Sequence, residues 1–169
     1  MDRIWAPWRK AYIRPSKRRR GGCLFCRLLK ENADRKNYIL KRTLSSFAIL
    51  NLYPYNNGHT LVLPMRHVDS LDRLTDREKL DLLDLYENVR KALRKTMKAQ
   101  GFNVGMNLGR VGGAGVPHHL HLHIVPRWSG DSNFMPVLGN TKIISESLRS
   151  VYEALLQSLE PSRRRRKSR

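Results

Sequence analysis

The 169-residue sequence predicts a single α+β domain in which helices cover an antiparallel sheet. Three observations support this fold class. Short β-rich segments follow one another as a meander, one long segment with helical spacing is inserted between them, and a second helical segment comes near the C-terminus. The sequence has no internal repeats. A meander with one inserted helix favours an antiparallel sheet that packs against helices.

The N-terminal part of the chain predicts an irregular segment, a short helix and a pair of strands. Residues 1–20 are expected to be extended or irregular, and their anchors onto a surface would be Trp5, Trp8 and Tyr12. Residues 23–32 favour a loop that continues as a short helix. Strands joined by a turn are expected at 38–43 and 46–52.

A turn-rich loop at 51–58 follows the strand pair, because Pro54 and Asn57-Gly58 favour tight turns. Residues 59–64 form another short β-rich strand. The long helix is the clearest element. Thr75 and Glu78 match a capping box, with Thr75 as N-cap. Apolar residues follow at helical spacing, and Gly101 suits the C-cap; the apolar residues are Leu82, Tyr86, Val89, Leu93 and Met97.

The last third predicts two strands, a loop and a helix. A strand at 102–108 is followed by a glycine-rich loop at 109–117 and a strand at 119–125. Residues 141–160 predict a closing helix. We expect one domain over 1–160, with an N-terminal extension, and a disordered basic tail at 161–169.

Histidines are concentrated in the strand at 119–125. Side chains alternate between the two faces of a strand, so His119, His121 and His123 share one face, about 6–7 Å apart. The other face, which carries Leu120, Leu122 and Ile124, is the expected core face, and His118 is expected to begin the strand. Imidazoles bind phosphate oxygens and act as nucleophiles, so this row favours a polyanion site over hydrogen-bonded histidines on a solvated face.

The loop before the histidines is rich in glycine. Glycines let backbone N–H groups approach an anion closely, so a loop placed directly before the histidine strand predicts a phosphate cradle. A mobile hairpin is the alternative. The glycines are Gly109, Gly112, Gly113 and Gly115.

The net charge of +19 indicates an anionic partner. Lys17–Arg20 and Arg163–Arg169 together hold ten positive charges, and the rest of the chain still carries +9, which is +19 less these ten. Nucleotides, nucleic acids and anionic membranes all fit this charge. The run at 163–169 is either a solvated end or a nucleic-acid-binding arm. No apolar run is long enough for a membrane span, and the N-terminus lacks a secretory pattern.

The two cysteines, Cys23 and Cys26, form a Cys-x-x-Cys pair. Two cysteines do not make a disulfide framework, which favours a reducing cytoplasm. The pair is half of a tetrahedral zinc site, for which the remaining ligands would come from His59, His67 or the histidine row. A redox pair and two ordinary thiols remain alternatives.

The segment His119-Leu120-His121-Leu122-His123-Ile124-Val125 resembles the His-φ-His-φ-His-φ-φ motif of the histidine triad (HIT) superfamily. Residues 46–67 and 105–137 are similar to the branch of diadenosine tetraphosphate phosphorylase-like and galactose-1-phosphate uridylyltransferase-like proteins, and so are residues 3–13. The resemblance covers most of residues 3–160. It implies the HIT-like fold, a homodimer and an enzyme that acts on nucleotides.

The resemblance also implies roles for individual residues. His121 would be the nucleophile that forms a nucleotidyl-histidine intermediate, His123 would contact phosphate, and His119 completes the catalytic triad. The implied substrate-binding residues are Asn51 at the ribose, His59 at the α-phosphate, Asn107 at the phosphate chain, and Gly113, Ala114, Gly115 and Val116 in the loop. The implied ligands of a structural zinc are Cys23, Cys26, His67 and His119.

One departure from the family pattern bears on the reaction. Many relatives carry Gly-Gln-Ser or Gly-Gln-Thr before the triad, whereas this chain has Gly113-Ala114-Gly115-Val116. This difference favours the phosphorylase-like branch. The expected reaction is cleavage of a dinucleoside polyphosphate at its α-phosphate, with inorganic phosphate as acceptor. A HIT hydrolase, a nucleotidyltransferase acting on a sugar phosphate, and a nucleic-acid-binding protein are the alternatives.

Overall fold

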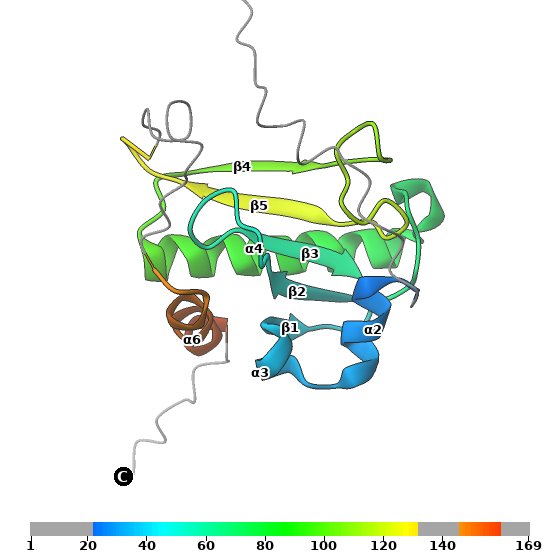
Figure 1. Ribbon diagram of the computed structural model, residues 1–169, viewed down its shortest axis with the longest axis horizontal. Coiled ribbons are helices and arrows are strands. Elements are labelled where there is room, and N and C mark those ends of the chain that lie inside the picture. The colour runs from blue at the N-terminus through cyan, green and yellow to red at the C-terminus, as the bar shows by residue number, and fades with distance from the viewer. Residues whose placement is uncertain (1–21, 132–145, 160–169) are drawn as a thin grey trace, which may run out of the picture.

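The computed structural model describes residues 22–131 and 146–159. Its centre is a five-stranded antiparallel sheet with the order β1-β2-β3-β5-β4, which confirms the expected α+β class (Figure 1). The strands are β1 (Ile39–Arg42), β2 (Ser46–Leu50), β3 (Thr60–Pro64), β4 (Gly101–Met106) and β5 (Leu122–Arg127). The helices are α2 (Leu24–Glu31), α3 (Asp34–Asn37), the 3₁₀ helix η1 (Leu71–Arg73), α4 (Asp76–Met97) and α6 (Leu148–Leu159).

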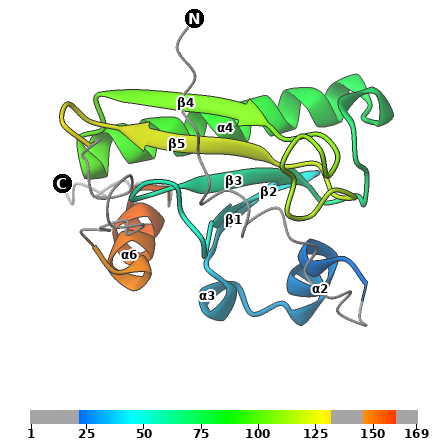
Figure 2. The same ribbon diagram turned by 45° about the horizontal axis from the view of Figure 1, so that its top comes forward.

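Helices α4 and α6 cover one face of the sheet (Figures 1 and 2). The apolar residues of α4 recur every three or four positions and therefore lie on one side of the helix. Leu85, Val89 and Leu93 are fully buried against Val62 and Ile124 of the sheet. This core fixes the strands that carry the site.

The opposite face of the sheet packs against α2. Phe25 of α2 is buried with Phe47 of β2 and Leu63 of β3 in a second apolar cluster. Ile49 pairs with Leu61, which in turn pairs with His123 of β5. Directly opposite residues of paired strands point to the same face, so His123 lies on the α2 face.

The ends of α4 follow one expectation and correct another. Thr75 and Glu78 form the expected capping box. Gly101 as C-cap is wrong, because α4 ends at Met97 and Lys98 takes the left-handed conformation. The N–H of Gln100 already donates to the carbonyl of Arg127 at 2.9 Å. Sheet pairing therefore begins before Gly101, which becomes the first residue of β4.

The histidine strand begins later and ends later than expected. His119 and His121 precede β5, because the N–H of Leu120 donates to the carbonyl of Val68 instead of to a strand. His118 is exposed and lies in a turn, so it does not begin the strand. β5 continues through Arg127 because that residue pairs with Gly101.

Smaller differences concern α3, which the sequence did not predict, and strand ends that differ from the expected bounds by one or two residues. The closing helix begins later than expected, because Glu146 and Ser147 are not helical and α6 starts at Leu148. The aromatic anchors Trp5, Trp8 and Tyr12, both basic runs and residues 141–145 and 160, which were expected in the closing helix, lie outside the described residues. Within the described ranges, no helix has the length and apolar character of a membrane span.

Candidate functional site

The three histidines of the triad lie beneath α2. His119 is 0% exposed and His121 is 6% exposed, and both rings contact Phe25, with centroid distances of 5.4 and 5.7 Å. The rings of His121 and His123 are 4.9 Å apart. The chain therefore buries His119 and His121 and leaves His123 half-buried, which makes each ring's protonation and hydrogen bonding decisive for its chemistry.

His121 is held in one tautomer by the backbone. Its Nδ1 lies 2.7 Å from the carbonyl oxygen of His119. A carbonyl oxygen only accepts, so Nδ1 carries the proton and the neutral ring has its lone pair on Nε2. Burial lowers the pKa of His121 and outweighs the opposing effect of the His119 carbonyl. No described residue hydrogen-bonds Nε2, which leaves a neutral nucleophilic nitrogen.

His59 and His123 form a directional pair of imidazoles. The N–H of Tyr55 donates to Nδ1 of His59 at 3.0 Å, so the proton of neutral His59 is on Nε2. That Nε2 lies 2.9 Å from Nδ1 of His123 and donates to it. The proton of His123 is then on its own Nε2.

His123 therefore presents an unpaired N–H donor. Its Nε2 is buried and has no hydrogen-bond partner among the described residues. Burial, with a smaller contribution from His121, lowers the pKa of His123 to about 4, so the ring is neutral at physiological pH. A buried donor without a partner is costly. An anionic oxygen beside His121 would satisfy it.

The loop at 51–58 supplies two further side chains to this pair. Oδ1 of Asn51 accepts from the N–H of Tyr53 at 3.0 Å, and Nδ2 lies 3.3 Å from Nδ1 of His59. The ring of Tyr55 stacks on His59 at 4.9 Å and on His123 at 5.9 Å. Tyr55 was not predicted from the sequence, although an aromatic residue four positions before His59 was a usable signal.

The glycine-rich loop is less open to an anion than expected. The N–H of Gly113 donates to the carbonyl of Arg110 at 3.0 Å, and that of Ala114 donates to Gly109 at 3.2 Å. Within the described ranges, the N–H groups of Gly115 and Val116 have no partner. Of the four loop residues expected to bind substrate, 113–116, only Gly115 and Val116 therefore retain N–H donors for an anion.

Asn107 lies next to the loop. A Cβ placed on Gly113 would be 3.8 Å from Nδ2 of Asn107. Gly113 has a φ of +90°, which L-residues with side chains rarely adopt. The structure thus brings the amide of Asn107 to the loop.

Cys23, Cys26, His67 and His119 form a separate cluster whose donor atoms all lie within 4.8 Å of one another. Nδ1 of His119 is 3.3 Å from Sγ of Cys23, and Nδ1 of His67 is 3.4 Å from Sγ of Cys26. A tetrahedral zinc ion with ordinary bond lengths separates sulfur from nitrogen ligands by about 3.5 Å. The cluster fits such an ion, and His59, which pairs with His123, is not part of it.

His119 connects the cluster to the nucleophile. Its Nε2–H donates to the carbonyl of Pro64 at 2.9 Å, so the lone pair on Nδ1 faces the cysteines. Its own carbonyl accepts from His121. The His119 ring therefore belongs to the Cys23, Cys26, His67 and His119 cluster, and its connection to His121 passes through the backbone.

Comparisons with known proteins agree with this arrangement. The HIT domain family pattern matches residues 32–130. AP-4-A phosphorylase of Mycobacterium tuberculosis is 36% identical over 162 residues, which are 92% of this chain and 83% of the relative. The asymmetrical bis(5'-nucleosyl)-tetraphosphatase of Schizosaccharomyces pombe is 39% identical over 93 residues, 55% of this chain and 50% of that protein.

Solved structures with the same fold come from several organisms. A histidine triad nucleotide-binding protein from Sulfolobus tokodaii has a TM-score of 0.67 at 27% identity, and covers 82% of this chain and 92% of its own. A Zn-bound histidine triad family protein from Mycobacterium smegmatis also has a TM-score of 0.67, at 24% identity. The match covers 82% of this chain and 93% of that protein's chain. These likenesses agree with the sheet and helices described above.

Proposed function

Because the chain belongs to the HIT domain family, we propose that it is an enzyme that cleaves dinucleoside polyphosphates of the diadenosine tetraphosphate type at an α-phosphate. The observation that carries this proposal is the fixed tautomer of His121, whose Nε2 has the lone pair and whose ring lies 4.9 Å from that of His123, the ring with the unpaired Nε2–H donor. A nucleophile next to an unpaired donor suits attack on a phosphorus whose oxygens gain charge.

In the first step, Nε2 of His121 attacks the α-phosphorus. A P–N bond forms, the bond from phosphorus to the bridging oxygen breaks, and ATP leaves with that electron pair. The imidazole becomes a cation whose Nδ1–H remains bound to the carbonyl of His119, which stabilises the positive charge. The Nε2–H of His123 donates to a phosphoryl oxygen.

In the second step, an acceptor oxygen attacks the same phosphorus and the P–N bond breaks, which returns neutral His121. Inorganic phosphate as acceptor gives ADP, whereas water gives AMP. The name of the mycobacterial relative, AP-4-A phosphorylase, supports phosphate. The small residues Gly113, Ala114 and Gly115 support it further, because they leave room for a second anion.

The rest of the substrate would be held by groups around this centre. Asn51 binds the ribose, and the His59–His123 pair binds the α-phosphate. Asn107 and the N–H groups of Gly115 and Val116 bind the phosphate chain. Two positions support this assignment: Asn107 lies next to Gly113 in the loop, and the carbonyl of Val116 accepts from the N–H of His119.

Zinc is the metal that best suits the cluster, because two thiolates and two imidazoles at tetrahedral spacing are typical of structural zinc sites. The ion would hold α2, which follows Cys23, against the segment that carries His119. The free thiols of Cys23 and Cys26 support a reducing compartment such as the cytoplasm.

A homodimer would form through the sheet edge at β4. This strand ends the sheet order, and Val104 is 43% exposed on it. An exposed edge strand with an apolar side chain is suited to pairing with a second copy. Nucleic-acid binding through residues 163–169 stays a prediction from the sequence.

Product chromatography with diadenosine tetraphosphate tests the reaction. ADP and ATP, formed faster when inorganic phosphate is present, would support phosphorolysis. AMP and ATP at an unchanged rate would make the enzyme a hydrolase. Uridylyl transfer to galactose 1-phosphate, in a parallel assay, would instead identify a sugar-phosphate nucleotidyltransferase.

A further inference from the structure

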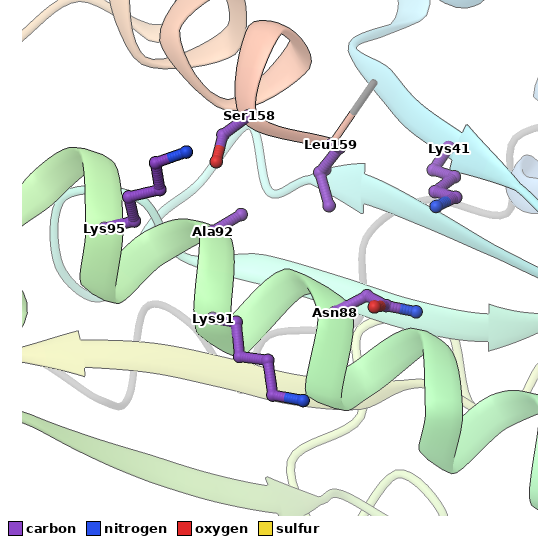
Figure 3. A pocket seen from close by; sticks show the side chains of 7 residues that line it. All are labelled: Lys41, Asn88, Lys91, Ala92, Lys95, Ser158 and Leu159. Carbon is purple, nitrogen blue, oxygen red and sulfur yellow. The ribbon is translucent and has the colours of Figure 1, made fainter. Parts of the chain in front are cut away.

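A second basic site lies on the other side of the sheet from the triad. Figure 3 shows the side chains that line a cavity between α4, β1 and the end of α6. The volume of this cavity is about 190 Å³. Three lysines surround it: Lys41 from β1, and Lys91 and Lys95 from successive turns of α4. Asn88 and Ser158 add an amide and a hydroxyl, and Ala92 and Leu159 complete the lining.

The charge of this cavity is uncompensated within the described part of the chain. No carboxylate lines it, and none of its three lysines forms an ion pair with a described residue. Glu87 is the nearest acidic residue along α4 and contributes a favourable charge interaction with Lys91. Its carboxylate, however, is held by two hydrogen bonds from Arg90, at 3.0 and 2.8 Å.

The sequence of α4 concentrates this charge. Residues 88–98 contain five basic residues and no acidic one, whereas the acidic residues of the helix all lie at or before Glu87. Basic residues near a helix C-terminus are favourable by themselves, through the helix dipole. The dipole does not explain Lys41, which comes from a strand, or the amide and hydroxyl that face the same cavity.

The cavity is separate from the catalytic site. Leu159 and Ala92 belong to the core on the helix face of the sheet, whereas His123 shares the α2 face with Leu61. A ligand in the cavity would therefore not occupy the nucleotide site.

From these observations we infer that the cavity binds a compact oligophosphate anion, such as tripolyphosphate or the phosphate chain of a nucleoside triphosphate. Three ammonium groups match several negative charges on one short chain, and the amide and hydroxyl donate hydrogen bonds to its oxygens. A cavity of about 190 Å³ bordered by three elements suits such a small anion better than a nucleic-acid backbone.

Calorimetric titration of the full chain tests this site, with AMP present at saturating concentration to fill the nucleotide site. Tripolyphosphate and ATP are titrated separately. Equal affinities would mean that the phosphate chain alone is bound, and tighter ATP binding would mean that the nucleoside adds contacts; both results support the site. Lys91→Gln/Lys95→Gln is expected to weaken tripolyphosphate binding at least tenfold and to leave AMP binding unchanged.

The matched control is Arg77→Gln/Lys98→Gln, which removes the same charge from the ends of α4 but does not alter the cavity lining. This variant should bind tripolyphosphate within twofold of the wild type. Equal weakening in both variants would overturn the inference, because it would show a response to net charge alone. Absence of tripolyphosphate binding, or loss of single-stranded RNA binding with unchanged tripolyphosphate binding, would also overturn it.

Discussion

His121 is buried, His123 is half-buried with a buried Nε2, and both rings are neutral, yet they present opposite groups to a substrate. The carbonyl of His119 leaves a lone pair on Nε2 of His121, whereas His59 leaves a proton on Nε2 of His123. Two rings with the same chemistry thus become a nucleophile and a donor through the partner of each Nδ1. The difference depends on single hydrogen bonds, so it can be tested by single substitutions.

Replacing His59 should remove the donor. His59→Leu deprives Nδ1 of His123 of its proton donor, so the proton of His123 is no longer directed to Nε2. We expect kcat to fall about 100-fold with a smaller change in KM, as for loss of one transition-state donor. Tyr55→Leu is the control, because its backbone N–H to His59 remains. Steady-state kinetics of the His59 variant within threefold of wild type would contradict the pair's role.

The pH dependence of His123 gives a second residue-scale test. Burial and His121 lower the pKa of His123 to about 4 from an unfolded value near 6.5. The neutral ring therefore stabilises the fold fully above about pH 6.5, and this contribution is lost as the pH falls through about 4. An NMR titration of the imidazole should give a pKa well below 6. A midpoint at or above 6.5 would contradict the buried neutral ring.

The alternation of side chains along a strand predicted that the three histidines share a face. The pairing of His123 with Leu61 and the contacts of His119 and His121 with Phe25 of α2 agree. The alternation could not predict that the His119 ring turns to the cysteines, because that depends on the carbonyl of Pro64, which lies 55 residues away in sequence. Nor could it predict the tautomers. Hydrogen bonds between distant segments decide these features, and periodicity contains no information about them.

At the scale of elements, α4 supports the catalytic loop through Gly58, the residue before His59. A Cβ on Gly58 would lie 2.6 Å from Sδ of Met97 and 3.0 Å from Cδ2 of Leu93. Gly58 also has a φ of +72°. The helix therefore packs directly on the loop that positions His59, and a side chain at position 58 would have to displace the end of Met97.

Gly58→Ala should destabilise the protein by about 2–4 kcal/mol, because strain at positive φ adds to overpacking against α4. Gly22→Ala is a matched control, since Gly22 has a φ of +74° and nothing lies within 4 Å of its added Cβ. The control should cost about 1 kcal/mol. Urea unfolding measures both; equal losses in the two variants would show that packing against Met97 is unimportant.

The start of α4 could be predicted from the sequence because its signal lies in neighbouring residues. The capping box of Thr75 and Glu78 depends only on residues three apart, and it is present. The end of α4 depends on Gln100 pairing with Arg127, which is a tertiary contact, and there the expected cap at Gly101 was wrong.

At the scale of the whole molecule, the metal cluster joins α2 to the catalytic segment. We expect one zinc ion per chain, measured by elemental analysis. Cys23→Ser should lose most of the zinc, because one of four ligands is replaced by a poor one. His118→Asn is the control: this neighbour of His119 is outside the cluster and should retain zinc. Full zinc content in Cys23→Ser would contradict the ligand set.

The central claim is that His121 carries the nucleotide during the reaction. The most direct measurement is mass spectrometry of the protein mixed with diadenosine tetraphosphate without inorganic phosphate, and then quenched in alkali, where a P–N bond survives. We predict an added adenylyl group on the peptide that contains His121, and its loss in His121→Asn, with turnover reduced by at least about 1,000-fold. An adenylyl group on another residue, or turnover by His121→Asn within threefold of wild type, would contradict the account.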